Sequence, residues 1–342
     1  MGSPDKALQP PRPVTLATIA KWAGVHASTV SRALSATPTG ISPATVDRIQ
    51  TLANALGYLP DQTAAALRTR RTHIIGVLVP RLTDIVLATI YEGIDAAAVE
   101  SGYQTVVANT RDDPDLQRVR LETLLARRVD GLILGDARRD TPLVDELAKR
   151  GVPFVLTSRR LPRHLSVTTD DLRGGGLAAE HLLSLGHVHI GVIAGEAYAS
   201  TGAERTKGFL DVCASAQTPL DPRYVVHTTF DVAGGRTGAE QLLRLRPRPT
   251  ALFAVNDFAA IGAMGAVRDA GLEVGTDVAI VGYNDVSIAG ELPVSLTTVR
   301  SPMFRMGQEA ARTLLSVLAG EPARSKRLRP RLIARASTLG PR

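Results

Sequence analysis

The chain has 342 residues, of which 44% are hydrophobic and 21% are charged. This length exceeds that of an average single domain, and the apolar content excludes a chain that is disordered throughout. Cys213 is the only cysteine, which excludes an intrachain disulfide and is typical of a reducing compartment. The formal net charge is +7, and residues 1–71 carry most of it, with two Lys and six Arg against three Asp. A basic head on a nearly neutral body indicates a polyanionic partner for the head, a solvated basic surface being the alternative.

Residues 1–13 are polar and rich in proline, and we expect them to form a disordered arm. No signal peptide and no apolar run of membrane-spanning length is apparent in the sequence. We therefore expect a cytoplasmic protein that makes no contact with a membrane.

Residues 15–34 predict two short helices joined by a tight turn. The small Ala20 allows close helix packing, and Gly24 would end the first helix in the left-handed conformation. Val25 and Val30 would close a miniature core. This spacing is typical of a helix-turn-helix, whose second helix enters the DNA major groove. The alternative is a corner of two helices with no role in DNA binding.

A third helix is predicted from Pro43, after Ser42 as its cap, to just before Gly57. We assign residues 14–60 to the DNA-binding domain. Residues 61–72 form a linker with a short helix that is too short to be stable alone in water.

From residue 73 onward, apolar strands alternate with amphipathic helices, such as those expected over 86–101 and 116–127. The runs are apolar throughout, as in strands that are covered on both faces. Strand–helix alternation predicts an α/β fold with two doubly wound, parallel subdomains. The expected strands are 74–79, 104–108, 131–134, 153–157 and 166–169 in the first subdomain, and 189–194, 251–255 and 278–283 in the second.

The segment VTLATIAKWAGVHASTVSRAL resembles the N-terminal signature of the LacI/GalR family of transcriptional regulators. The resemblance continues along the chain in IGVLVP (75–80), DGLILG (130–135), AVNDFAAIGAM (254–264) and VAIVGYND (278–285). It implies a core that is similar to periplasmic sugar-binding proteins and binds a small-molecule effector, a sugar or related polyol. It also implies a homodimer or tetramer that binds a near-palindromic operator as a repressor, with no cofactor and no enzymatic activity.

The resemblance also implies that the chain crosses between the core subdomains three times. We place the first subdomain at about residues 73–169 and 299–326, and the second at about 170–298 and 327–342.

The resemblance assigns the base-reading positions to Ala27 and Ser28, and Arg32 one turn further should reach a guanine. His26 replaces the usual serine cap, so the start of this helix is expected to be less well fixed. In the short linker helix, Leu67 matches a leucine that wedges between base pairs in the minor groove, the alternative being packing onto the next domain. The implied DNA contacts are Thr15, Ala27, Ser28, Thr29, Ser31, Arg32, Ala64 and Leu67.

Polar residues follow the strands of the predicted sheets, where doubly wound folds bind ligands. Carboxylate, amide and guanidinium groups hydrogen-bond to hydroxyls, which suits a sugar or another polyol. The resemblance implies that Arg205, Asp257 and Asn284 contact the effector and that Phe230 packs on it; a helix cap or surface position is the alternative for each. The predicted effector contacts are Asp84, Ser158, Arg205, Phe230, Asp257 and Asn284.

The chain departs from the family where the usual Asn-Pro-Phe-Phe segment reads Asp84-Ile85-Val86-Leu87, which removes stacking aromatics. We interpret Arg159 and Arg160 as part of a solvated loop, the alternative being that their positive charge near the cleft favours an acidic or phosphorylated ligand. A corepressor-dependent regulator with a phosphorylated or nucleoside effector therefore stays open as a second interpretation. A solute-binding protein or an enzyme that shares the core fold is a third.

His181, His187 and His189 superficially resemble metal ligands, but a turn explains them better and no metal is expected.

Overall fold

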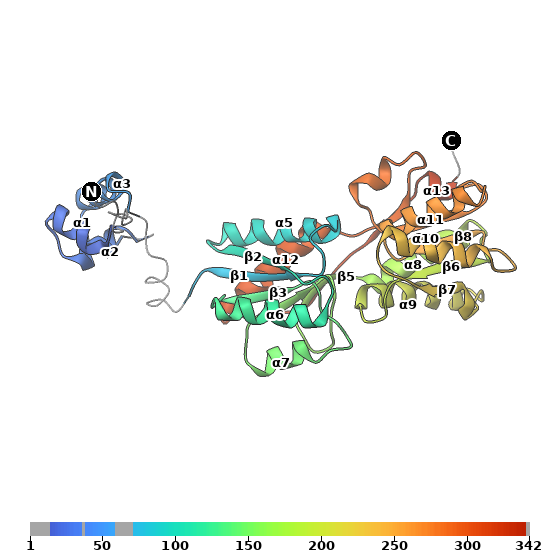
Figure 1. The fold of residues 1–342 in the computed structure, drawn as a ribbon, viewed down its shortest axis with the longest axis horizontal. Helices are drawn as coiled ribbons and strands as arrows, with labels where there is room; N and C mark the ends of the chain where they lie inside the picture. The colour runs from blue at the N-terminus through green and yellow to red at the C-terminus, as the bar shows by residue number, and fades with distance from the viewer. Residues whose placement is uncertain (1–13, 36–37, 59–70, 340–342) are drawn as a thin grey trace, which may run out of the picture. The chain divides into compact units, whose positions relative to one another are not determined.

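The computed structural model describes residues 14–35, 38–58 and 71–339. It divides into two compact units, Met1–Thr72 and His73–Arg342, and each is described by itself (Figure 1). The predicted N-terminal arm lies outside the described residues, as do Ala64 and Leu67 of the predicted linker helix.

The first unit contains α1 (Leu16–Ala23), α2 (Ala27–Ala33) and α3 (Pro43–Ala55), which pack around a small apolar core. Ile19, Val30 and Ile49 are fully buried in this core. Gly24 ends α1 with φ of 63°, a left-handed conformation in which a Cβ would be strained. The structure thus confirms the helix-turn-helix that the sequence predicts.

The first subdomain of the second unit is a parallel sheet in the order β11-β5-β4-β3-β1-β2. Helices α5 (Ile85–Glu100) and α12 (Met303–Leu318) cover one face, and α6 (Pro114–Ala126) and α7 (Leu143–Lys149) cover the other. The strands are β1 (Ile74–Val79), β2 (Gln104–Asn109), β3 (Gly131–Leu134), β4 (Phe154–Thr157), β5 (Ser166–Thr169) and β11 (Lys326–Leu328).

The second subdomain has a sheet in the order β12-β10-β9-β8-β6-β7, which is parallel except for β12. Its faces are covered by α8 (Asp171–Ser184) with α9 (Ser200–Ser215) and by α10 (Val232–Leu243) with α11 (Asp257–Asp269). The strands are β6 (Ile190–Ala194), β7 (Val225–His227), β8 (Ala251–Ala254), β9 (Ala279–Asn284), β10 (Thr297–Arg300) and β12 (Arg331–Ile333). Short elements are η1 (Pro222–Tyr224), η2 (Ser287–Gly290) and α13 (Ala336–Leu339).

The chain passes between the two sheets after β5, after β10 and between β11 and β12. The later crossings differ slightly from the predicted positions, because Val299 lies in β10 of the second sheet and Arg327 in β11 of the first. The chain therefore leaves each of these strands a few residues later than the sequence indicates. The α/β class and the two doubly wound subdomains are confirmed.

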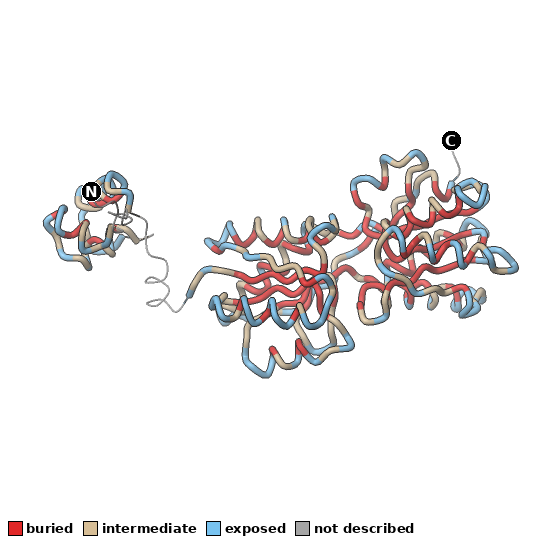
Figure 2. The backbone as a smooth tube through the Cα atoms, in the orientation of Figure 1, coloured by how far each residue is buried: buried red, intermediate tan, exposed pale blue. Residues whose placement is uncertain are grey.

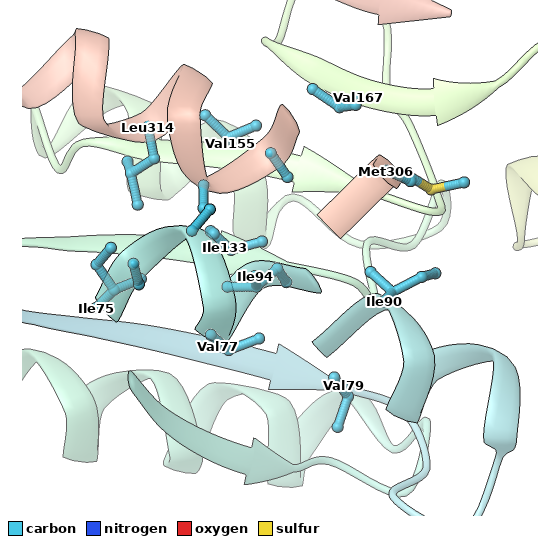
Figure 3. Close-up of a cluster of buried hydrophobic side chains, with 14 of the residues drawn as sticks. Ile75, Val77, Val79, Ile90, Ile94, Ile133, Val155, Val167, Met306 and Leu314 are labelled. Carbon is cyan, nitrogen blue, oxygen red and sulfur yellow. The ribbon is translucent and has the colours of Figure 1, made fainter. Parts of the chain in front are cut away.

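Burial follows the inner strands of both sheets, which are red along most of their length in Figure 2, whereas the edge strands β2, β7, β11 and β12 are half-buried or exposed. In the first subdomain, Ile75, Val77 and Val155 from the sheet meet Ile94 of α5 and Leu314 of α12 (Figure 3). All five are 0–1% exposed, and Leu78, Leu132 and Leu156 on the opposite face of the sheet are also fully buried, so these apolar runs are covered on both faces as predicted. This packing fixes the carboxyl ends of the strands, from which the polar loops extend.

Candidate functional site

The helix-turn-helix is capped at both of its helix starts. Thr15 caps α1, accepting from the backbone N–H of Thr18 at 3.2 Å. His26 caps α2 through Nδ1, which accepts from the backbone N–H of Ser28 at 3.3 Å and lies 2.8 Å from its Oγ. The imidazole therefore caps α2 in place of the usual serine, and the start of α2 is better fixed than we expected from the sequence.

The outer face of α2 presents the polar residues that were predicted to read bases. Ser28 and Arg32 are exposed and lie one helical turn apart, so both side chains share one face. Ala27, Thr29 and Ser31 are half-buried around them, and Thr15 is exposed at the start of α1. The arrangement leaves the hydrogen-bonding groups of Ser28 and Arg32 exposed on one face of α2.

A cavity of about 70 Å³, lined by both polar and apolar side chains, lies in the second unit; we call it the inner cavity. Five of the six predicted effector residues line it, from both subdomains. The lining comprises Pro80, Arg81, Asp84, Val86, Leu87, Asp112, Gly135, Ser158, Arg159, Thr201, Arg205, Phe230, Asn256 and Asn284.

Asp257 is the exception among the predicted residues, because its side chain points into the protein. It is fully buried, and its carboxylate accepts from Thr298 Oγ1 at 2.5 Å and from the backbone N–H of Val286 at 2.9 Å. Gly282 provides the space that the Asp257 side chain needs, because a Cβ there would lie 2.4 Å from Asp257 Oδ1. Burial raises the pKa of this carboxyl to about 7. The structure places the neighbouring Asn256 at the cavity instead.

Arg205 lies on α9, between the cavity and the core of the second subdomain. Its guanidinium donates to Asp171 Oδ1 and to the carbonyl of Val255, both at 2.8 Å, and lies over the Tyr283 ring. The residue is 6% exposed, so most of its hydrogen-bonding capacity holds the protein together. The face that lines the cavity is rigidly positioned for a ligand.

Asn284 ends β9 at the cavity with a strained backbone. Its φ is 111°, in the region that favours glycine, although the residue carries a side chain. The residue is 4% exposed, and its buried Oδ1 has no hydrogen-bond partner. Strain together with an unsatisfied buried acceptor makes Asn284 a candidate binding residue.

Asp84 and Phe230 are held by local contacts. Asp84 caps α5, accepting from the backbone N–H of Val86 at 3.0 Å, and burial raises the pKa of its carboxyl. The Phe230 ring lies against Gly195, where a Cβ would come within 2.1 Å of it. Ser158 follows β4 with φ of 60°, which aims this short loop at the cavity.

Two cavity residues, Asp112 and Arg159, are functional candidates that the sequence reasoning missed as a pair. Arg159 donates a hydrogen bond from each of its two terminal nitrogens to the Asp112 carboxylate, each at 2.7 Å. Burial opposes ionisation of Asp112, but the Arg159 hydrogen bonds outweigh it and its pKa lies below the usual range. The partners are 47 positions apart, and no local pattern links them.

Contacts across the cleft join the two subdomains near this pair. The Tyr198 hydroxyl of the second subdomain lies within hydrogen-bonding distance of the carboxylates of Glu196 and, at 2.9 Å, Asp112, and Arg138 of the first subdomain lies 3.6 Å from the centre of the Tyr198 ring. Arg160 also reaches across to Glu204, at 2.8 Å. One wall of the inner cavity is therefore closed by mostly buried polar contacts.

A second contact between the two subdomains is weaker. Arg81 of the first subdomain lies 3.5 Å from Asp231 of the second, with 44% and 42% of their side chains exposed. An exposed ion pair of this kind contributes about 0–1 kcal/mol. The cleft is thus easier to open on the Arg81 side.

Within the part of the chain that the structure describes, no cluster of three or more His, Cys, Asp or Glu is arranged to hold a metal ion. His181 instead pairs with Thr338 Oγ1, at 2.8 Å. Among the described helices, none combines the length and hydrophobicity that a membrane span requires.

A helix-turn-helix unit, followed by a two-sheet core with a polar cleft, defines a ligand-responsive DNA-binding regulator. Comparison with known families agrees: residues 15–61 match the model described as bacterial regulatory proteins, lacI family, and residues 179–338 match the periplasmic binding protein-like domain. The HTH-type transcriptional regulator DegA of Bacillus subtilis (strain 168) is 34% identical over 95% of this chain and 98% of its own. The chain therefore belongs to the LacI family. It is a transcriptional regulator and not an enzyme.

Solved structures are similar over nearly the whole chain. The transcriptional regulator CelR–cellobiose complex has a TM-score of 0.73 and 32% identity, covering 95% of this chain and 99% of that one. The lac repressor dimer bound to operator and the anti-inducer ONPF has a TM-score of 0.88 and 28% identity, covering 96% and 100%.

Proposed function

We propose that this protein is a cytoplasmic, homodimeric repressor that binds a near-palindromic operator under the control of a sugar or related polyol in the inner cavity. The observation that carries the effector site is Asn284, whose strained backbone holds an unsatisfied buried oxygen at the cavity. A ligand hydroxyl would supply the missing hydrogen bond. The similarity to a dimer bound to operator supports the dimer and the DNA target.

In the DNA complex, α2 of each protomer lies in a major groove. Arg32 reads a guanine through its two-pronged donor, and Ser28 contacts a neighbouring base or phosphate. The two-fold symmetry of the dimer requires two inverted half-sites. We propose as DNA contacts Thr15, Ala27, Ser28, Thr29, Ser31, Arg32, Ala64 and Leu67.

A neutral polyol fits the inner cavity better than a phosphorylated ligand. Arg159 is paired with Asp112 and Arg205 with Asp171, so neither guanidinium brings an uncompensated charge. The ligand meets amide, hydroxyl and carboxylate groups, which match alcohols. We propose as contacts the five predicted residues that line the cavity, Asp84, Ser158, Arg205, Phe230 and Asn284, together with Asp112, Arg159 and Thr201.

Control of DNA binding follows from the position of the cavity between the subdomains. A ligand that contacts both favours one relative orientation of the subdomains over the others. In the dimer, that orientation sets the spacing of the segments that lead to the DNA-binding units. The ligand then changes operator affinity by the ratio of its affinities for the two states.

Two measurements test the proposal. Selection from a random duplex library should give inverted half-sites, and a thermal-shift screen of sugars and polyols should give a stabilising ligand. That ligand should change operator affinity by roughly 5- to 150-fold, the usual range of allosteric coupling. An asymmetric binding site, or a screen in which no polyol binds, would contradict the proposal.

A further inference from the structure

One side of the cleft between the core subdomains is held by a set of polar contacts that we call the latch. Its residues follow β3 and β4 in the first subdomain, and β6 and the start of α9 in the second. The latch comprises Arg138, Arg139 and Arg160 of the first subdomain and Tyr198, Ser200 and Glu204 of the second. Each of its contacts therefore joins segments that belong to different sheets.

Two backbone amides of the first subdomain donate across the cleft. Arg139 N–H donates to the carbonyl of Tyr198 at 3.0 Å, and Arg160 N–H donates to Ser200 Oγ at 2.8 Å. Both amides lose these partners when the subdomains separate, because each partner lies in the other subdomain. The exchange of these two N–H groups with solvent therefore measures the opening of the cleft directly.

Side chains reinforce the two backbone contacts. Arg160 donates from Nε to the Glu204 carboxylate at 3.0 Å, and a terminal nitrogen lies 2.8 Å from the other carboxylate oxygen. The Glu204 side chain is only 9% exposed, so water screens this two-pronged pair less than it screens the exposed Arg81–Asp231 pair. Arg138 adds its guanidinium over the Tyr198 ring. The latch is thus the firmer of the two connections across the cleft.

The loops that carry the first-subdomain half of the latch are held in strained conformations. Asp112 has φ of 60° and Ser158, two residues before Arg160, also has φ of 60°. Non-glycine residues keep such conformations only where the surrounding contacts hold them. The Arg159–Asp112 pair joins the two loops, so Arg160 projects from a base that is fixed within its own subdomain.

The inner cavity is small for the class of ligand that we propose for it. Its volume is about 70 Å³. An engineered protein cavity that binds benzene has a volume of about 150 Å³. A hexose has more heavy atoms than benzene, so it needs more room than this arrangement of the subdomains offers. Separation of the subdomains provides that room, and the latch opposes this separation.

We propose that the latch is an autoinhibitory contact, which holds the core closed and thereby lowers its affinity for the effector. The effector binds the core after the latch has broken, so its apparent affinity is reduced by the small fraction of molecules that are open. This inference rests on the proposed function, which places the effector in the inner cavity and couples the subdomains to operator binding.

Hydrogen exchange on the full chain, with no ligand added, tests whether the latch is closed. In wild type, the amides of Arg139 and Arg160 should exchange slowly. In the double variant Tyr198→Phe with Glu204→Gln, both should exchange about tenfold faster or more, because the loss of charged hydrogen bonds favours opening. Fast exchange of both amides in wild type, or no acceleration in the variant, would refute the latch.

Two single variants complete the exchange experiment. Tyr224→Phe is the matched control, because it removes a tyrosine hydroxyl that donates to the Pro247 carbonyl at 2.7 Å within the second subdomain. It should leave the exchange of Arg139 and Arg160 unchanged. Glu204→Gln alone keeps the shape of the side chain and should accelerate exchange less than the double variant does, which covers the case in which the double variant does not fold.

Calorimetry with D-glucose, D-galactose, D-ribose and sorbitol tests the autoinhibition. At least one of these probes should bind the double variant about tenfold more tightly than wild type, although neither Tyr198 nor Glu204 lines the inner cavity. Tyr224→Phe should bind that probe with wild-type affinity.

The remaining outcomes separate this inference from the proposed function. A probe that binds wild type and the double variant equally, or the variant more weakly, would refute the autoinhibition and leave the inner cavity as the effector site. Failure of every probe to bind either protein would refute the proposed effector class and the autoinhibition with it.

Discussion

The guanidinium carbon of Arg205 lies 3.8 Å from the centre of the Tyr283 ring. Aromatic stacking on one side and the buried ion pair with Asp171 on the other make Arg205 part of the fold as well as of the cavity wall. The role of Arg205 in the fold can be measured in the absence of effector, because only its contact with the ligand depends on the effector.

Arg205→Met should lower the free energy of unfolding by about 3–5 kcal/mol, because it leaves the Asp171 carboxylate buried without its partner. The double variant Arg205→Met with Asp171→Asn should recover part of this loss, since it removes the orphaned charge. Urea unfolding of both variants measures the difference. Equal stabilities of the single and double variants would show that the pair is not coupled.

Asn284→Gly should stabilise the protein by about 1–3 kcal/mol, because glycine adopts a positive φ without strain. The same change should lower effector affinity about tenfold or more, because it removes the side chain that we propose accepts a hydrogen bond from the ligand. Thermal unfolding and calorimetry measure the two effects. Gln217→Gly is the matched control: its φ is 58° and it is exposed after α9, so relief of strain there should leave effector affinity unchanged. Loss of stability in Asn284→Gly would contradict the assignment.

Asp257 should make stability fall as pH rises from about 4 to about 7. Its pKa is raised to about 7 by burial, so in this window the folded protein keeps a proton that the unfolded chain has lost. Asp257→Asn should lack this fall, because a neutral amide can still accept from Val286 N–H and donate to Thr298. Between about pH 5 and about pH 8, wild type should lose roughly 1–3 kcal/mol more than the variant in urea unfolding. Parallel pH profiles would show that the carboxyl is not protonated in the folded state.

Arg32→Lys should separate specific from non-specific DNA binding. Lysine keeps the positive charge but lacks the two-pronged donor that pairs with guanine, so preference for the selected operator should fall by about 1–3 kcal/mol. Affinity for random DNA at the same salt concentration should stay close to wild type. Titrations of labelled operator and random duplexes give both values. Equal losses on the two duplexes would make Arg32 a phosphate contact.

Strands such as β1, β6 and β9 could be predicted from sequence because they contain continuous apolar runs. The prediction for β1 matches the observed Ile74–Val79, whereas β7, β10, β11 and β12 were absent from the predicted set. These four strands have three or four residues each, and β11 reads Lys-Arg-Leu. Their conformation depends on pairing with a neighbouring strand, and the local sequence does not show which segment of the chain that neighbour is.

The candidate site, too, could be predicted from the sequence only in part. Asp84 and Asn284 could be placed at the cavity because the carboxyl ends of parallel strands meet at one edge. The inward turn of Asp257 depends on Thr298, which is 41 positions away, and on the space above Gly282. The close packing of α8 on α9 also depends on a distant residue, because a Cβ on Gly175 would lie 1.9 Å from the Arg205 carbonyl oxygen.

The strands β11 and β12 lie only a few residues apart near the end of the chain, yet each completes a different sheet. A chain that emerges from the ribosome N-terminus first therefore cannot complete either sheet until residues 326–333 have been synthesised. A message cut short before Lys326 leaves β5 and β10 as open sheet edges, the kind of surface that pairs with other chains and aggregates. Such a fragment would still contain the whole helix-turn-helix, but not a completed core to regulate it.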